Sequence, residues 1–87
     1  MTYYKVELKK PAEKALFKLP KPVIAKVIHL LKELEQNPRP NGCKKLTGSN
    51  NSYRIRTGDY RVVYSIFDDV LVIDIIKIGH RKEIYKH

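Results

Sequence analysis

The sequence predicts an α+β fold in which a two-helix hairpin packs on an antiparallel four-stranded sheet, in the chain order β-α-α-β-β-β. Two observations predict this class. The first half of the chain contains two stretches that each follow a proline and repeat apolar residues at helical spacing. The second half contains three runs of residues that favour strands, joined by two-residue links. Links that short join antiparallel neighbours, and helices beside such a sheet form one α+β layer pair.

Length and composition agree with one folded domain over residues 1–87. A chain of this size buries only about two-thirds of its unfolded surface, so a second core has no room. Hydrophobic residues make up 43% of the chain and charged residues 31%, which is too apolar for a disordered tail. No apolar run approaches the roughly 18 residues that cross a bilayer, and the chain does not begin like a signal peptide. We therefore expect a cytoplasmic protein that neither spans a membrane nor is secreted.

The first half is expected to hold one strand and two helices. Residues Thr2–Leu8 alternate polar and apolar side chains, as a strand does. Pro11 opens a helix that runs to Leu19, because proline fits the first helical turn, and Pro20 ends it. The second helix starts at Pro22 and stops before Pro38. Its apolar face repeats at three- and four-residue spacing through Val23, Val27, Leu30, Leu31 and Leu34.

The second half is expected to form a meander of three strands after a long loop. Residues Asn37–Ser52 are rich in Pro, Asn, Gly, Ser and Lys and have no period, so they predict the loop. The strands expected after it are Tyr53–Thr57, Tyr60–Phe67 and Val70–Gly79, with Gly58-Asp59 and Asp68-Asp69 as the links. The first strand of the chain can then join this sheet as its fourth, while the helices cover one face.

The charge of the chain points to a polyanionic or acidic partner. Eighteen Lys and Arg against nine Asp and Glu give a net charge of +9. Eight of the thirteen lysines lie in residues 1–43, and we interpret them as a solvated surface. Four of the five arginines lie in the second half: Arg54, Arg56, Arg61 and Arg81. Because a guanidinium group is a planar fork that suits phosphate oxygens, this segregation indicates a phosphate site in the second half.

Strand geometry gives three of these arginines a common direction. Side chains alternate along a strand, so Arg54 and Arg56 leave the same face, opposite Tyr53 and Ile55. By hairpin pairing, Arg61 can share that face. Like charges crowded across strands are destabilising unless an anion lies among them, which favours a binding site. The alternative is a solvated sheet face whose basic residues only discourage edge pairing, and the pattern alone favours neither reading.

The sequence does not predict a metal or another cofactor. Its single cysteine, Cys43, can form neither an internal disulfide nor a cysteine-based zinc site. The three histidines are scattered without metal-ligand spacing. Any chemistry is therefore expected to depend on the protein's own side chains.

The order of short motifs along the chain resembles the RelE/ParE superfamily of type II toxin-antitoxin toxins. The resemblance covers nearly the whole chain, from the first strand and the helical hairpin to the closing segment. Its motifs are Lys45-Leu46-Thr47-Gly48, Tyr53-Arg54-Ile55-Arg56, Tyr60-Arg61-Val62-Val63-Tyr64, and Gly79-His80-Arg81 followed by Tyr85. The RelE branch looks like ribonucleases that cleave mRNA in the ribosomal A site, whereas the ParE branch looks like gyrase poisons without the nuclease residues.

The resemblance to RelE implies a role for each matched residue. Arg54 and Arg56 match basic residues that face the RNA backbone, although the best-known members carry lysines there. Lys44 and Lys45, in the preceding loop, are assigned with them to RNA binding. Arg61 matches an arginine that holds a phosphate, Arg81 an arginine near the leaving group, and Tyr85 a tyrosine that stacks on a base or aids proton removal. The terminal helix of those members is almost absent here.

RNA cleavage of this kind needs no metal, because the 2′-hydroxyl of RNA is the nucleophile. The enzyme aligns it with the phosphate, neutralises the developing oxyanion and moves two protons. Arg61 and Arg81 are the expected oxyanion clamp. For proton transfer, His80 and Tyr85 both stay open, since the reference pKa of histidine is about 6.5 and that of tyrosine about 10.

We therefore predict a toxin that acts as a metal-independent endoribonuclease on ribosome-bound mRNA and inhibits translation. Its expected partner is an acidic RelB-like antitoxin in a hetero-oligomer, since an acidic, partly disordered chain is the simplest antagonist of a +9 surface. Two alternatives remain: a ParE-like toxin without nuclease activity that acts on DNA gyrase, and a plain RNA-binding module.

Overall fold

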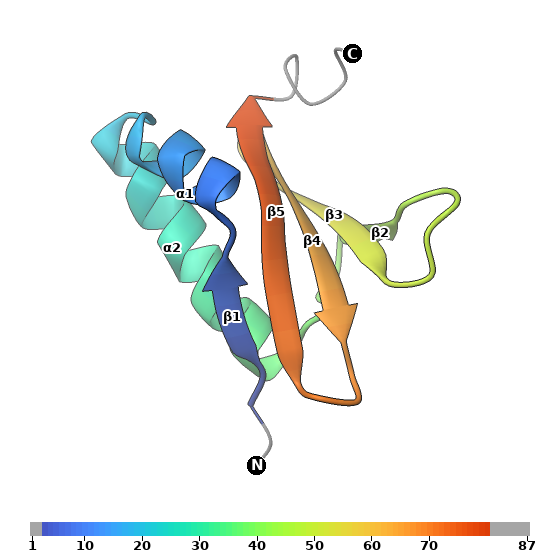
Figure 1. The fold of residues 1–87 in the computed structure, drawn as a ribbon. Helices are drawn as coiled ribbons and strands as arrows, with labels where there is room; N and C mark the ends of the chain where they lie inside the picture. Colours follow the sequence, from blue (N-terminus) through green and yellow to red (C-terminus); the bar gives the residue numbers. More distant parts are fainter. Residues whose placement is uncertain (1–2, 81–87) are drawn as a thin grey trace.

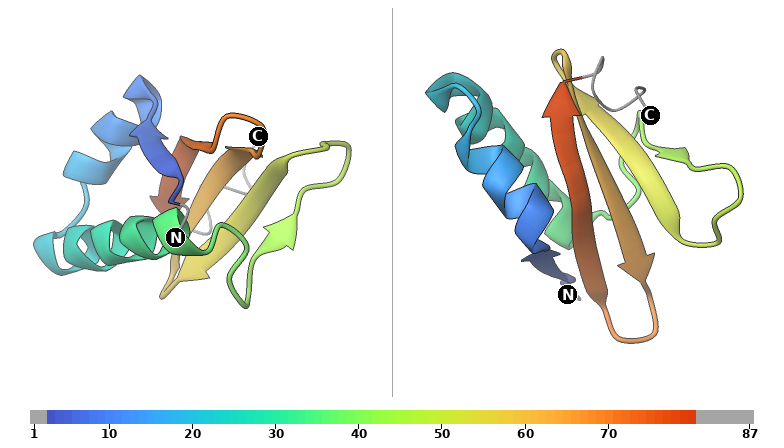
Figure 2. Two further views of the ribbon diagram at one scale, coloured as in Figure 1. Left: turned by 90° about the horizontal axis from the view of Figure 1, so that it is seen from below. Right: turned by 45° about the horizontal axis from the view of Figure 1, so that its top comes forward.

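The computed structural model of the chain describes residues 3–80 (Figure 1). Two helices lie along one side of a twisted sheet, so the fold has two layers. The view from below separates the helical layer from the strands (Figure 2, left). Within the described residues, the opposite face of the sheet carries no helix.

The sheet has five strands rather than the four expected. They are β1 (Lys5–Leu8), β2 (Lys44–Lys45), β3 (Ser52–Thr57), β4 (Tyr60–Phe67) and β5 (Val72–His80), in the spatial order β1-β5-β4-β3-β2. Strands β2 to β5 pair antiparallel, whereas β1 pairs parallel with β5. The α+β class and the two helices on one face are confirmed. The prediction of a four-stranded, purely antiparallel sheet is wrong.

Both differences have a physical reason. A two-residue link fixes the relative direction of the two strands that it joins. Both helices and three strands separate β1 from β5 along the chain, so no short turn fixes the direction of β1 relative to β5. The strand β2 falls inside the segment expected to be a loop. Its two residues pair with Arg54 and Tyr53 of β3, and a strand that short has no detectable period.

The β4–β5 connection is longer than the sequence suggested. It comprises the four residues from Asp68 to Leu71, so β5 begins at Val72 rather than Val70. Leu71 has a φ of 56°, an unusual conformation for a leucine. The preceding hairpin agrees with expectation, because β3 and β4 are joined by Gly58 and Asp59, with Gly58 at a φ of 62°.

The helices begin and end close to the expected prolines. Helix α1 (Lys10–Phe17) has Pro11 in its first turn, and helix α2 (Lys21–Gln36) has Pro22 there. A proline costs nothing at these positions, because the first N–H groups of a helix have no intrahelical partner. Neither helix is long and apolar enough to cross a membrane, as far as the described residues extend.

One hydrophobic core lies between the helices and the sheet. The predicted packing of Val27, Leu31 and Leu34 against the sheet is confirmed, since all three are buried. From the sheet, Tyr64 is fully buried, and its hydroxyl donates a hydrogen bond of 2.8 Å to the Pro38 carbonyl oxygen. The buried apolar residues are Ala12, Leu16, Val27, Leu30, Leu31, Leu34, Ile55, Val62, Tyr64, Ile66, Ile73, Ile75 and Ile78.

A β-bulge changes which residues of β5 face this core. Val63 of β4 pairs with Lys77, but the next residue, Tyr64, pairs with Ile75, so Ile76 is the extra residue. An extra residue inverts the alternation of side chains on the two sides of the bulge. Ile75 and Ile78 therefore both face the core, although they are three residues apart.

Candidate functional site

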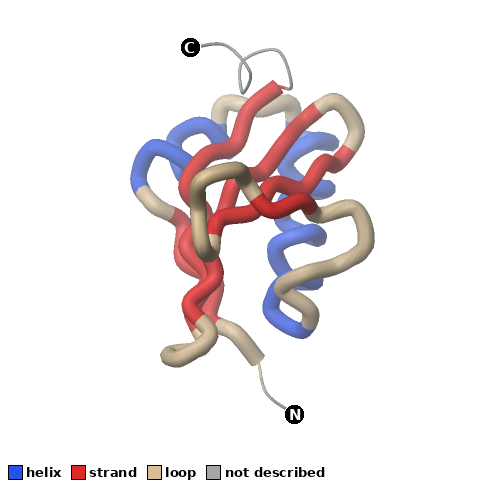
Figure 3. Tube along the Cα trace, turned by 90° about the vertical axis from the view of Figure 1, so that its right-hand side faces the viewer, coloured by secondary structure: helices blue, strands red, loops and turns tan. Residues whose placement is uncertain are grey.

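Basic side chains gather on the face of the sheet opposite the helices. Arg56 pairs directly with Arg61 across β3 and β4, and Lys44 pairs directly with Arg54 across β2 and β3. Directly paired residues share a face of the sheet, and so do Arg54 and Arg56, which are two positions apart. The prediction that Arg54, Arg56 and Arg61 share one face is confirmed. Figure 3 views the molecule from the side where β2 and β3 lie.

These four side chains line one open pocket of about 420 Å³, which we call the arginine pocket. Arg54 and Arg61 are half-buried, and the Nε atom of Arg61 is shielded from solvent. Lys44 and Arg56 are exposed at the pocket rim. The other described lining residues are Asn41, Gly42 and Ile55, so no acidic residue is among them. The arginine pocket is therefore a concentration of positive charge that suits an anion with several oxygens.

The loop between α2 and β2 forms one wall of the arginine pocket. It supplies Asn41 and Gly42, for which the sequence predicts no role. Gly42 has a φ of 94°, a conformation that glycine adopts at no steric cost. The Asn-Gly pair is a turn signal that was available in the sequence, but nothing in it shows that the turn meets β3.

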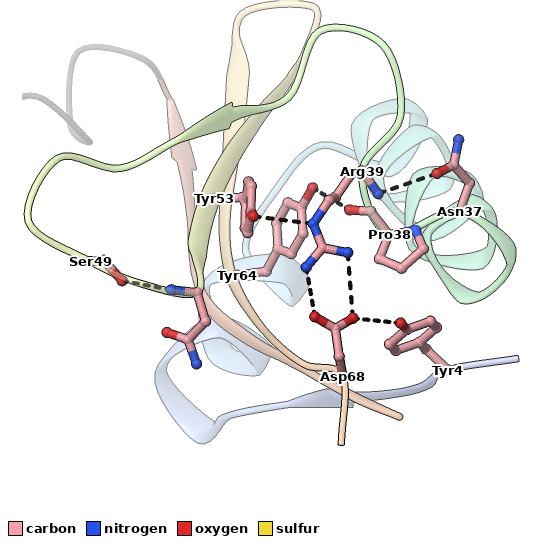
Figure 4. Close-up of polar contacts among 9 residues, drawn as sticks. Tyr4, Asn37, Pro38, Arg39, Ser49, Tyr53, Tyr64 and Asp68 are labelled. Atoms are coloured by element: carbon pink, nitrogen blue, oxygen red, sulfur yellow. Dashed lines mark hydrogen bonds and ion pairs between the residues drawn. The ribbon is translucent and has the colours of Figure 1, made fainter. Parts of the chain in front are cut away.

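Arg39 and Asp68 fix the start of this loop to the far end of the sheet (Figure 4). The Arg39 guanidinium donates two hydrogen bonds to the Asp68 carboxylate, at 2.8 Å and 3.4 Å, and its Nε donates a third of 3.1 Å to the Tyr53 hydroxyl. The guanidinium carbon also lies 5.3 Å from the centre of the Tyr53 ring, which stacks on Tyr64. The hydroxyl of Tyr4 donates a hydrogen bond of 2.6 Å to the same carboxylate.

The ionisation of this cluster follows from its hydrogen bonds. Donation from Arg39, and then from Tyr4, lowers the pKa of the Asp68 carboxyl group below its ordinary value. The bond to Asp68 raises the pKa of the Tyr4 hydroxyl, and burial raises that of Tyr64. Asp68 is thus held ionised as the partner of Arg39. We assign Arg39, the one arginine outside the predicted set, to the structure of the loop rather than to the pocket.

Two further predicted site residues that the structure describes, Lys45 and His80, do not line the arginine pocket. Lys45 pairs with Tyr53 and lies on the face of the sheet opposite Lys44. His80 pairs with Tyr60, and its ring meets the Tyr60 ring edge-on with 5.4 Å between centroids. Since Gly79 pairs with Arg61, His80 lies on the opposite face from Arg61. Arg81 and Tyr85 lie outside the described residues.

The described part of the chain offers no metal site. Within residues 3–80, no group of three or more His, Cys, Asp or Glu side chains is placed to hold a metal ion. Cys43 is half-buried and forms no disulfide. The chemistry that the arginine pocket can supply is the binding and neutralisation of an anion.

The sequence and the fold are similar to those of known toxins. The family model described as "ParE toxin of type II toxin-antitoxin system, parDE" matches residues 6–85. A protein of Methanocaldococcus jannaschii named as toxin RelE1 is 37% identical, and the alignment covers 97% of each chain. An archaeal RelE–RelB complex from Pyrococcus horikoshii OT3 contains a chain that is 38% identical, with a TM-score of 0.82 over 93% of this chain and 97% of that one.

A bacterial toxin gives the same fold. The isolated RelE toxin of E. coli is 29% identical, with a TM-score of 0.79 over 88% of this chain and 83% of that one. The matched family and these three relatives agree with the family that the sequence motifs resemble. The chain therefore belongs to the RelE/ParE family of toxins of type II toxin-antitoxin systems.

Proposed function

We propose that this toxin is a metal-independent endoribonuclease that cleaves mRNA on the ribosome by attack of the 2′-hydroxyl on the adjacent phosphodiester. The observation that carries the proposal is the arginine pocket, in which Arg54, Arg56, Arg61 and Lys44 converge without an acidic residue among the described lining residues. Basic residues that only discouraged pairing with another strand would need their positive charge, but they would not need to line a pocket.

The pocket can supply the electrostatic part of this reaction. The negative charge on the phosphate oxygens grows in the transition state, and fixed donors in a partly dry site stabilise it most. Arg61 fits this role, because its guanidinium is half-buried and its Nε is shielded from solvent. The exposed Arg56 and Lys44 would contact phosphates on either side of the cleaved bond. By resemblance to RelE, we assign Arg81 to a position near the leaving group.

Proton transfer is assigned first to Tyr85 and second to His80. Arginine stays protonated at neutral pH and cannot serve as the base. His80 lies on the face of the sheet opposite Arg61, so reaching the phosphate would require the end of β5 to rearrange. Tyr85 is assigned to this step by resemblance alone.

We further propose that an acidic RelB-like antitoxin covers the arginine pocket. The solved relatives include a RelE–RelB complex, and the net charge of +9 favours an acidic partner. An antitoxin that folds as it binds would bury the basic face and exclude RNA.

The experiment is single-turnover cleavage of ribosome-bound mRNA with analysis of the product ends. The expected products carry a 2′,3′-cyclic phosphate, or the 3′-phosphate formed from it, and a 5′-hydroxyl. Lys44→Ala should slow cleavage, whereas Lys45→Ala, a matched control on the neighbouring residue that does not line the pocket, should not. Tyr85→Phe and His80→Gln compare the two proton-transfer candidates. Products with a 5′-phosphate and a 3′-hydroxyl would exclude attack by the 2′-hydroxyl.

A gyrase-directed toxin is the second candidate, because the family model that matches the chain is named for ParE. A supercoiling assay with purified gyrase separates the two. Inhibition of gyrase by the wild type and the Arg61→Ala variant alike, without mRNA cleavage, would favour this second function.

A further inference from the structure

A second cavity of about 470 Å³ adjoins the arginine pocket. It lies between the outer side of α2 and the end of β3, and the loop after α2 borders it. Asn41, Ile55 and Arg56 line both cavities, so the two cavities adjoin at these residues. A chain bound in the arginine pocket can therefore extend past Arg56 into this second cavity.

The second cavity differs from the arginine pocket in its chemistry. Leu30, Ile55 and Pro40 give it an apolar lining, of which Leu30 and Ile55 are buried. Its cations, Lys26 and Arg56, share the lining with an acidic residue, Glu33. A carboxylate in the lining makes the cavity a poorer phosphate site than the arginine pocket, since it repels an anion.

The polar groups of the cavity suit the edge of a flat heterocycle. His29 lies with its Nε2 atom 3.6 Å from a carboxylate oxygen of Glu33, one helical turn away. Together with the Asn41 amide and the Thr57 hydroxyl, these groups offer both hydrogen-bond donors and acceptors. An apolar floor with donors and acceptors at its rim is the environment that binds an unstacked nucleobase.

We propose that the cavity between α2 and β3 binds the nucleobase of a nucleotide next to the phosphate held in the arginine pocket. The inference rests on the proposed function, because it takes the RNA backbone to lie in the arginine pocket. The base enters beside Arg56, its face lies on Leu30 and Pro40, and its edge meets His29, Glu33 and Asn41. The cavity thereby contributes to the choice of sequence at the cleavage site, which the arginine pocket cannot make, because phosphate contacts carry no sequence information.

The test is an NMR titration of the full-length wild-type protein with a 2′-O-methyl trinucleotide, which cannot be cleaved by its own 2′-hydroxyl. Two further trinucleotides lack the 5′ or the 3′ base. The complete trinucleotide should shift the amide signals of Leu30 and Thr57 as well as those of Arg54 and Arg61. Removal of one of the two bases should abolish the shifts at Leu30 and Thr57 and weaken binding by roughly five- to 150-fold, the contribution of one stacked base.

A variant that fills the cavity provides an independent measurement. Ala25 lines the cavity and is exposed on α2, so Ala25→Phe should fill it without disturbing the core. This variant should bind the complete trinucleotide no better than it binds the trinucleotide without the base whose removal weakens binding to the wild type. Ile28→Phe is the matched control, because Ile28 is exposed on the same helix but does not line the cavity, and it should bind as the wild type does.

The outcomes distinguish the inference from the function on which it rests. Equal affinity for all three trinucleotides, with shifts at Arg54 and Arg61 alone, would overturn the base site and leave the RNA site in the arginine pocket intact. Shifts at neither set of residues would overturn both. The comparison of trinucleotides uses the wild type, so it does not depend on the folding of a variant.

Discussion

Arg56 on β3 lies directly opposite Arg61 on β4, on the face of the sheet that the helices leave uncovered. Like charges at directly opposite positions of a sheet destabilise the fold. Arg54 and Lys44 form a second such pair across β2 and β3. Four cations thus lie at one place on the sheet, and a bound anion would reduce the repulsion between them.

The first prediction concerns this repulsion. Arg56→Gln should raise the melting temperature at low salt, by up to about 4 °C, because it removes one of the two opposed charges. Inorganic phosphate should raise the melting temperature of the wild type more than that of the variant, since a ligand stabilises the state that binds it. Differential scanning fluorimetry gives both values. Lys45→Gln is the control for the loss of one charge elsewhere, and identical phosphate shifts in all three proteins would contradict a phosphate site at Arg56.

The second prediction assigns the chemical step to Arg61. Arg61→Ala should lower the single-turnover rate of mRNA cleavage by about two to three orders of magnitude, the effect of removing one oxyanion donor. The rate is measured with saturating ribosome complex, so that weaker binding does not contribute. Arg61→Lys should recover only part of the rate, because an ammonium group cannot donate the paired hydrogen bonds of a guanidinium. A rate within threefold of the wild type for Arg61→Ala would remove Arg61 from the reaction.

The third prediction is a pH dependence that arises from Asp68. Its pKa is lower in the folded protein than in the unfolded chain, where it is about 4. The unfolded state thus binds the proton more tightly, so the stability that Asp68 contributes is present above about pH 4 and is lost as the pH falls through the folded pKa. Thermal unfolding from pH 7 to pH 2 should show this loss in the wild type.

Asp68→Asn should lower the melting temperature at pH 7. On acidification, the melting temperature of this variant should fall less than that of the wild type. Asp69→Asn is the matched control, because Asp69 is the neighbouring exposed carboxylate, whereas the Arg39 guanidinium donates its hydrogen bonds to Asp68. Parallel pH curves for the wild type and Asp68→Asn would contradict a role of this ion pair in stability.

The fourth prediction tests the packing of α2. Leu31→Ala should reduce the free energy of unfolding by about 2–5 kcal/mol, because Leu31 is 7% exposed and its side chain belongs to the core. Ile28→Ala, on the same helix but 39% exposed, should cost less. Chemical denaturation gives both values, and a loss below about 0.5 kcal/mol for Leu31→Ala would place this helix face in solvent.

The fifth prediction concerns the antitoxin. If an acidic antitoxin is captured by the +9 surface, its association rate should fall steeply as the salt concentration rises, while the dissociation rate changes less. Stopped-flow fluorescence at several salt concentrations measures both. An association rate that does not depend on salt would argue against electrostatic capture.

Local pattern was sufficient to predict much of the fold. The spacing of Val27, Leu31 and Leu34 on α2 predicted the buried face, because helical periodicity depends only on residues a few positions apart. The alternation of Arg54 and Arg56 with Tyr53 and Ile55 predicted the basic face for the same reason. The short links between β3, β4 and β5 fixed their antiparallel order.

The sequence by itself thus determined which residues are helical, which form the central strands and which arginines share a face. Only the tertiary structure decided the parallel pairing of β1, the wall formed by Asn41 and Gly42, and the face on which His80 lies. The last of these depends on the bulge at Ile76, since one extra residue inverts the alternation along the rest of β5 and turns His80 away from Arg61. A bulge and a strand direction are set by contacts between segments far apart in the chain, and local pattern does not record such contacts.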